Sequence, residues 1–274
     1  MHIITHNSTG ENSIKIPINT RSSKIIFNDA NYNNITLYID NPISLKDSSH
    51  NILLSISSFQ IPISWPIISN YLGNNIFEYT INGTTYNYII PDGSYSANDL
   101  KTLFNSNTLL LVTYSKTTGK YIFTHDTYNF SITNNTTCYY EIGFANDNYT
   151  STLMSLSSIK PIDLGGSRSI YIKSNLSTDN YNIYGKTSNI IDIIPINVSN
   201  FDILRYTNSE GFKMKIHDQS IYSINIILED DHQNKIDINN DWELVLELNK
   251  IVNSNYPLTN NVVDKPNIQD IIES

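Results

Sequence analysis

The stretch IDINNDWELVLEL, near the end of the chain, begins with side chains that could bind calcium. Asp237, Asn239 and Asp241 have the spacing of the first three ligands of an EF-hand loop. That loop also requires glycine at its sixth position and a bidentate glutamate at its twelfth. This chain has Trp242 and Leu248 there, so the pattern indicates a polar turn that leads into a strand.

Other residues that could do chemistry have no partners at a useful spacing. No two of the histidines have the spacing of metal ligands on one helix or strand. They are His2, His6, His50, His125, His217 and His232. Cys138 is the one cysteine, which excludes an internal disulfide framework. We expect it to be a small buried hydrophobe within a tyrosine-flanked strand.

Motifs for nucleophilic catalysis or for phosphate binding are also missing from the sequence. DLGGSRS, residues 163–169, combines glycines with serine, but it follows no hydrophobic strand and indicates a flexible connection. We therefore predict no catalytic, cofactor-binding or metal-binding residues and no cofactor. An enzyme whose site is assembled from distant residues stays as a third hypothesis.

Composition and charge narrow the class of protein. The chain has 274 residues and a formal net charge of −9, and its Lys and Arg residues are scattered singly. Binding to a nucleic-acid backbone needs clustered positive charge, so that function is disfavoured. No stretch approaches the ~18 apolar residues of a membrane span, and no signal peptide is visible. Abundant Ile, Tyr and Thr favour a mostly β fold.

Strand patterns of similar length lie before residue 70 and after residue 165. Six of them follow one another at roughly ten-residue spacing in the second half, which is typical of a sandwich or barrel. The strands are expected at 34–40, 51–65, 169–176, 189–198, 201–208, 212–218, 221–230 and in the second half of IDINNDWELVLEL.

The middle of the chain has a different pattern. Asn82-Gly83 separates two alternating runs and predicts a hairpin, and Thr118-Gly119 predicts a second one. Between them, Ser96 followed by Asp99 is typical of a helix N-cap. Further strands are expected at YNFSITN and CYYEIGF. The 19 tyrosines include alternating ones in TYNYII and TCYYEIGF, which either pack this sheet or bind a partner.

These patterns predict one β-sandwich with a small α+β domain inserted between its early and late strands. The expected boundaries follow chain order. They are an N-terminal arm at 1–33, the first part of the sandwich at 34–70, the inserted domain at 71–154, the second part of the sandwich at 155–250 and a C-terminal tail at 251–274.

The order of several segments resembles a known family. SFQIPISWPIIS leads to NNIFEYTINGTTYNYIIPDGSYSANDL, then TGKYIFTH, EIGF and DLGGSRSIYIKSNL, and finally INIILEDDHQNKIDINNDWELVLEL. This succession resembles the penton, or minor capsid, proteins of virophages and polinton-like viruses, and it spans roughly residues 34 to 250.

The resemblance implies that the sandwich is a single jelly roll with an inserted small α+β domain. It also implies a structural virion protein and no enzyme. Five copies would close each five-fold vertex of an icosahedral capsid, with the major capsid protein as neighbour and the inserted domain facing outward. Such a protein would be made in the host cytoplasm or a viral factory and end in the virion. A second hypothesis is a jelly-roll attachment module that binds a host receptor or glycan through the insertion.

Overall fold

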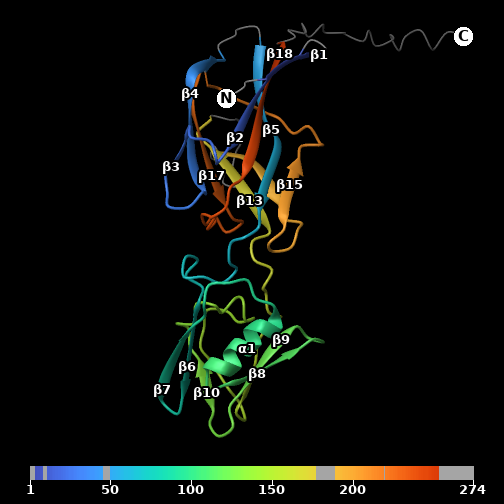
Figure 1. Cartoon of the computed structure of the whole chain (residues 1–274). Coiled ribbons are helices and arrows are strands. Elements are labelled where there is room, and N and C mark those ends of the chain that lie inside the picture. The colour runs from blue at the N-terminus through green and yellow to red at the C-terminus, as the bar shows by residue number, and fades with distance from the viewer. Residues whose placement is uncertain (1–3, 9–10, 46–49, 177–188, 219, 253–274) are drawn as a thin grey trace, which may run out of the picture.

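Two lobes, one above the other, make up the computed structural model of the protein, and two chain segments connect them (Figure 1). The structure describes residues 4–8, 11–45, 50–176, 189–218 and 220–252. The upper lobe holds strands from both ends of the chain, and the lower lobe holds the middle of the chain and its helix.

The upper lobe is a sandwich of two antiparallel sheets. The first sheet has the order β1-β2-β18-β5-β15, with β16 beside another part of β5. Its strands are β1 (Ile4–Ser8), β2 (Glu11–Asn19), β18 (Glu243–Val252), β5 (His50–Pro62), β15 (Ile203–Thr207) and β16 (Met214–Lys215).

The second sheet has the order β14-β13-β17-β4-β3. Its strands are β14 (Ile190–Pro195), β13 (Ser169–Ser174), β17 (Ser220–Glu229), β4 (Asn34–Ser44) and β3 (Ile25–Phe27). Inward-facing Ile and Leu residues from both sheets form one hydrophobic core. That alternation of buried and exposed positions is what a sheet with one wet face requires.

The strand pairing identifies the topology as a jelly roll. Without β1, β3 and β16, eight strands remain, and the first of them, β2, pairs with the last, β18. The second pairs with the seventh, the third with the sixth and the fourth with the fifth, all antiparallel. A long hairpin wound into two four-stranded sheets gives this nested order. The sequence prediction of a jelly-roll sandwich is therefore confirmed.

Strand β18 occupies the middle of its sheet, between β2 and β5. As the alternation predicts, Trp242, Leu244, Leu246 and Leu248 are all buried, each at most 1% exposed. Glu243 lies on the other side, where its carboxylate accepts a hydrogen bond of 2.6 Å from Gln60. The Trp242 ring lies 6.0 Å from that of Phe59, and its Nε1 donates to the carbonyl of Tyr32 at 2.7 Å.

The lower lobe is the inserted α+β domain, and its elements lie between β5 and β13. One sheet has the order β11-β10-β6-β7 and the other β12-β9-β8. The elements are β6 (Ile76–Ile81), β7 (Thr84–Ile89), α1 (Ala97–Asn107), β8 (Leu111–Ser115), β9 (Lys120–Thr124), β10 (Phe130–Ile132), β11 (Tyr149–Thr150) and β12 (Ser155–Ser157). Asn82 and Gly83 both have positive φ, as a two-residue hairpin turn requires.

Helix α1 begins and packs as its sequence predicts. Ser96 and Asp99 form a capping box, each accepting a hydrogen bond from the other's backbone. Phe104 of the helix lies 4.8 Å from Phe77 and 6.0 Å from Phe123, in ring centroids. Tyr86 stacks on Tyr79 at 5.3 Å. The TYNYII tyrosines therefore pack against the core of this lobe, which favours the packing interpretation for them.

The strand predicted at CYYEIGF is wrong, because this segment forms turns. Phe144 donates its backbone N–H to Tyr139, and Gly143 donates to Tyr140, which is the hydrogen-bond pattern of a Schellman motif. Gly143 has φ of +80°, and a Cβ there would lie 2.4 Å from the carbonyl oxygen of Lys160. The glycine closes a helical turn that the alternating letters conceal.

The N-terminal segment also differs from its prediction. Residues 1–33, expected as an N-terminal arm, contain β1, β2 and β3. Ile16 and Ile18 of β2 are buried in the sandwich core. The alternating Ile14, Ile16 and Ile18 therefore belong to a full strand that pairs with β18. The predicted tail, 251–274, lies outside the described residues, except for its first two positions in β18.

Each lobe has its own hydrophobic cluster. That of the sandwich includes residues up to Trp65 and from Ile170 onward. The cluster of the insertion runs from Ile67 to Phe144, with Ile162 and Leu164 packed against it. We propose that the two clusters are two folding units, with boundaries near those expected from the sequence. Among the described residues, no helix is both long and apolar enough to span a membrane.

Truncation of Leu246 tests the central position of β18. Leu246→Ala removes a side chain that is 0% exposed, and we expect it to lower the free energy of unfolding by about 2–5 kcal/mol. Glu247→Gln is the matched control, because its partner Lys15 is 4.0 Å away at the surface and such pairs contribute about 1 kcal/mol or less. Urea unfolding measures both. Equal losses would place β18 outside the core.

Excision of the insertion tests the two folding units. Replacing residues 67–166 with a short Gly-Ser linker removes the second cluster and leaves every strand of the sandwich. We expect the remaining chain to unfold in one cooperative transition, as a domain with its own core does. Circular dichroism during thermal unfolding measures this. A product without a cooperative transition would show that the sandwich needs the insertion.

Candidate functional site

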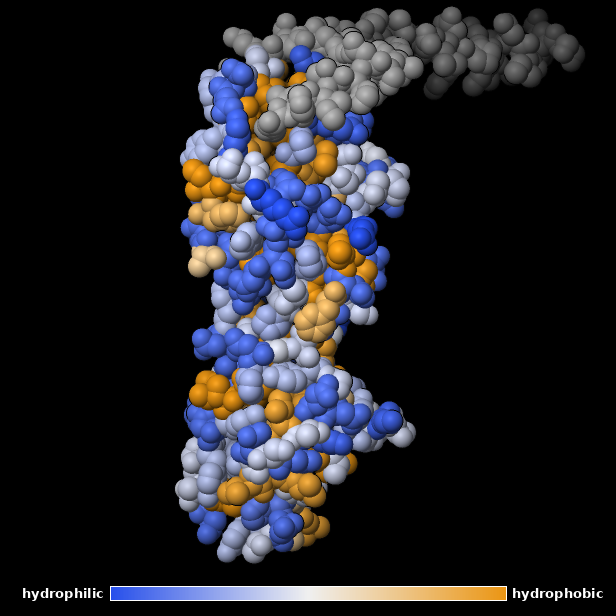
Figure 2. Space-filling view, viewed as in Figure 1, coloured by the Kyte–Doolittle hydropathy of each residue, from blue (hydrophilic) through white to orange (hydrophobic). Residues whose placement is uncertain are grey.

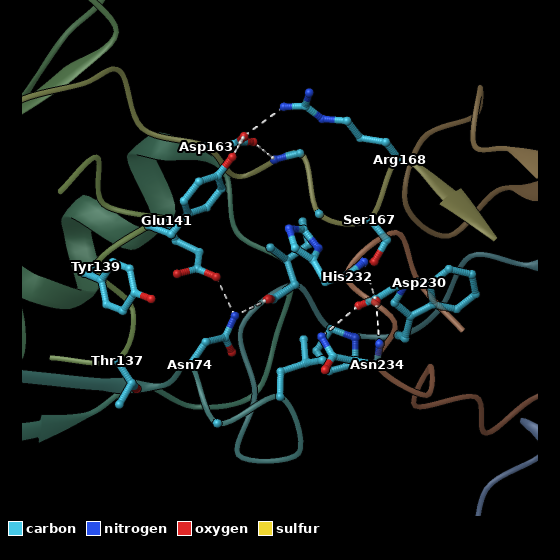
Figure 3. A pocket seen from close by; sticks show the side chains of 18 of the residues that line it. Asn74, Thr137, Tyr139, Glu141, Asp163, Ser167, Arg168, Asp230, His232 and Asn234 are labelled. Atoms are coloured by element: carbon cyan, nitrogen blue, oxygen red, sulfur yellow. Dashed lines mark hydrogen bonds and ion pairs between the residues drawn. The ribbon is translucent and has the colours of Figure 1, made fainter. Parts of the chain in front are cut away.

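A cleft of about 590 Å³ lies where the two lobes meet (Figure 3). Its size is typical of small-ligand pockets. The wall from the insertion carries Asn74, Thr137, Tyr139 and Glu141. The opposite wall carries polar side chains of the segment before β13 and of the turn after β17. These are Ser167, Arg168, Asp230, His232 and Asn234. Asp163 lies on the insertion side, where its backbone N–H donates to the carbonyl of Glu141 at 3.1 Å.

Glu141 is placed in the cleft by the helical turn that Gly143 closes. The backbone of this turn is held by the N–H of Ile142 on the carbonyl of Cys138, and Cys138 is fully buried beneath it. Cys138 is therefore a small buried hydrophobe, as predicted, although it lies in a turn. Burial raises the pKa of its thiol well above the usual value, so it is poorly suited to act as a nucleophile.

The Glu141 carboxylate is only partly satisfied. Its Oε1 accepts a hydrogen bond of 2.5 Å from the side-chain amide of Asn74. Its Oε2 is buried and has no hydrogen-bond partner among the described residues. Burial is the largest influence on this group and raises its pKa above the ordinary value; the nearby charge of Asp163 adds to the rise, and His232 across the cleft opposes it.

The opposite wall is more fully bonded. Asp230 Oδ1 accepts from the backbone N–H groups of His232 and Asn234, at 2.9 and 2.8 Å. These bonds hold the tight turn that follows β17. Arg168 donates to Asp163 Oδ2 at 3.0 Å, and Tyr140 donates to the same oxygen at 3.2 Å. Arg168 is therefore already paired with an acid.

Asp230, Asp231 and His232 form a cluster that the sequence spacing did not indicate. Their ligand atoms lie within 4.8 Å of one another. Asp230 is engaged by the turn, and the N–H of Arg168 donates to Asp231 Oδ2 at 3.4 Å. His232 Nδ1 lies 3.4 Å from Asp231 Oδ1. The only sequence signal for this cluster is that the three residues are adjacent. In a strand, adjacent side chains point to opposite faces, so the sequence did not predict that they meet. The turn after β17 brings them together.

The acidic run that opens IDINNDWELVLEL is bonded within the protein. Asp237 accepts from the Asn31 amide at 2.7 Å. Asp241 accepts from Thr20 at 3.0 Å and from Arg21 at 2.9 Å, and the Arg21 guanidinium lowers the pKa of its carboxyl. This geometry agrees with the predicted polar turn. The forecast that the chain has no metal site stays a prediction.

Two flanks of the sandwich expose large apolar side chains. On one side both sheets end, in edge strands β14 and β15. Four exposed residues lie on or near these two strands, and the most exposed is Phe201 at 75%. They are Ile193, Phe201, Ile203 and Phe212. The opposite flank carries Ile26 and Phe27 on β3 and Tyr38 on β4. Figure 2 shows hydrophobic residues along both edges of the upper lobe.

A groove of about 480 Å³ runs along the β14–β15 flank. On it, Tyr206 donates a hydrogen bond of 3.1 Å to Asp192 Oδ2. Burial raises the pKa of Asp192, and burial together with that carboxylate raises the pKa of Tyr206 to about 12. The hydroxyl therefore stays protonated at neutral pH and keeps donating. Neither sheet continues past this flank among the described residues, so two strand edges are left open.

Glu141→Gln tests the burial of the carboxylate. Because the pKa of Glu141 is raised in the folded state, its stabilising contribution is present below the unfolded pKa of about 4.3 and is lost as pH rises through the folded pKa. Glutamine stays neutral, so we expect the variant to gain stability relative to the wild type between about pH 4 and 7. Urea midpoints across this range measure it. The burial is contradicted if the stability difference between Glu141→Gln and the wild type does not change with pH. It is also contradicted if Glu210→Gln shows an equal change.

Comparison with known proteins finds little at the level of sequence. No family model matches the chain, and no curated protein matches it either. Among solved structures, the chain is similar to the mavirus penton protein in its selenomethionine-labelled crystal form, with 13% identity and a TM-score of 0.49. The match covers 87% of this chain and 99% of that chain. This identity and this TM-score carry no argument about function, so the function has to be inferred from the surfaces of this chain.

Proposed function

We propose that this protein is a structural capsid protein whose copies associate side by side into closed rings of five. The observation that carries the proposal is the pair of apolar flanks on opposite edges of one jelly roll. Monomers rarely expose large apolar residues in groups, and such groups mark interaction surfaces. Ile26, Phe27 and Tyr38 of one copy would pack against the β14–β15 flank of the next.

The two flanks differ in shape and residues, which sets the symmetry. One consists of the short strand β3 beside β4, and the other consists of two open strand edges and a groove. A contact between unlike surfaces is heterologous, so it closes a ring or continues as a filament. The resemblance of the sequence to penton proteins favours a five-membered ring in the virion, with the major capsid protein around it and the insertion outward.

The second candidate function is attachment to a receptor or glycan. It is favoured by the cleft between the lobes, whose polar lining has no task in side-by-side assembly. Exposed strand edges, in contrast, have no task in ligand binding. The two functions use different surfaces of one chain, and assembly is the one for which the apolar flanks are needed.

Flank variants test the assembly. The wild-type protein should form pentamers by mass photometry and five-fold rings by electron microscopy. Phe201→Asp and Ile26→Asp each place a charge on one flank, so each should be monomeric. An equimolar mixture of the two variants should form dimers and nothing larger, because one intact flank of each kind remains. That outcome is specific to a heterologous contact.

Ile89→Asp is the matched control, because Ile89 is an exposed isoleucine on the insertion and on neither flank. It should keep the pentamer. A wild-type protein that stays monomeric at all concentrations would overturn the proposal. So would a mixture of the two flank variants that contains monomers alone.

A further inference from the structure

The cleft between the lobes contains half-buried polar groups that no residue of the described chain satisfies. On the insertion wall, Glu141 Oε2 is buried without a hydrogen bond among the described residues. The hydroxyl of Tyr139, half-buried on the same wall, donates to no described residue. On the opposite wall, the half-buried Ser167 hydroxyl is equally free of partners in the described chain. Figure 3 shows these three side chains around one space.

These groups include both hydrogen-bond donors and acceptors, which narrows the class of ligand that could satisfy them. Glu141 Oε2 can only accept a hydrogen bond when ionised, whereas the two hydroxyls can both donate and accept. Thr137 is similar, because its Oγ1 accepts from the N–H of Ile76 at 3.0 Å and its hydroxyl proton stays available. A ligand that satisfies all four groups must itself carry several groups that donate and accept.

The charges of the cleft disfavour other ligand classes. An anion would face Glu141 and Asp230, while the guanidinium of Arg168 is already paired with Asp163. An apolar ligand would bury the free polar groups without partners, which costs free energy for each one. A small cation would suit Glu141, but a bare cation neither donates nor accepts hydrogen bonds. It would therefore leave the hydroxyl protons on both walls without acceptors.

The aromatic residues of the cleft complete the pattern. Trp65 and Tyr139 line it together with the exposed ring of Tyr140. Tyr140 is fixed at its hydroxyl by Asp163, so its ring is held in place. Aromatic rings offer an apolar face beside polar groups, and the C–H faces of a sugar ring pack on such surfaces while its hydroxyls reach the polar ones.

We propose that the cleft between the jelly roll and the insertion binds a neutral saccharide of one or two rings. In this site Glu141 Oε2 accepts a hydrogen bond from a sugar hydroxyl, and the Tyr139 and Ser167 hydroxyls bond the same ligand from opposite walls. The proposal does not rest on ring assembly, because the site lies within one protomer. It explains why a carboxylate oxygen is buried without a partner at this place in the fold.

Binding is tested on the full-length protein with free sugars as probes. Saturation-transfer NMR and calorimetry are run with glucose, galactose, mannose, N-acetylglucosamine and their common disaccharides. At least one should bind in saturable fashion. Tyr139→Phe and Ser167→Ala each remove one hydroxyl and should weaken that binding about three- to tenfold, the effect of one hydrogen bond.

The controls separate the site from non-specific effects. Tyr128→Phe and Ser157→Ala make the same chemical changes on the insertion away from the cleft, and both should bind like the wild type. Ethanolamine and inorganic phosphate probe the rival cation and anion classes. The proposal is overturned if no sugar binds, if binding ignores Tyr139→Phe and Ser167→Ala, or if ethanolamine or phosphate binds while the sugars do not. These outcomes do not depend on whether the protein forms rings.

Discussion

The nested pairing of first strand with last is the constraint on which this structure depends. β18 forms backbone hydrogen bonds to β2 on one side and to β5 on the other, so the two ends of the chain meet in the middle of one sheet. Trp242 and the leucines that follow it then fill the space between the sheets. Because closing such long loops costs entropy before it gains contacts, the sandwich needs this buried face to hold its ends together.

Once the outer strands are paired, the middle of the chain is free to form something else. The winding leaves the connection between β5 and β13 at one end of the sandwich, where a loop can lengthen at little cost in stability. Here the connection has become a lobe with its own aromatic core around Phe77 and Phe104. The turn that holds Asp230 faces this lobe, so the cleft exists because both lobes have turns at the same end.

Local patterns predicted the elements well, because alternation and turn chemistry act over a few residues. Asn82-Gly83 gave its hairpin, and Ser96 with Asp99 gave its helix start. The misses have non-local causes. A short Ile alternation in a polar segment reads as an edge until β18 is known to pair with it. CYYEIGF alternates like a strand, yet the close approach of Lys160 to Gly143 holds it in a turn.

The candidate site was harder to foresee for the same reason. Nothing in the letters around Glu141 distinguishes it from a solvated acid, since its neighbours Asn74 and Asp163 lie far away in the sequence. The exposed flanks were equally hidden, because an isoleucine in a strand pattern is read as core unless the strand is known to be an edge. Whether a side chain is exposed depends on which elements pack beside it in the fold, and the periodicity of one segment carries no information about those neighbours.

The two proposed surfaces are physically adjacent, and this limits how they can act. Asn200 lines the cleft, and the next residue, Phe201, is the most exposed apolar side chain of the flank. Phe201 has φ of +70°, so this part of the chain is held in a conformation that few residues with bulky side chains adopt. A neighbouring copy packed on Phe201 would therefore lie beside the mouth of the cleft. If that contact shifts the segment, ligand and ring each change the other's affinity by the same factor, as thermodynamic linkage requires. If the segment stays rigid, that factor is one, and each protomer of the ring presents an independent site.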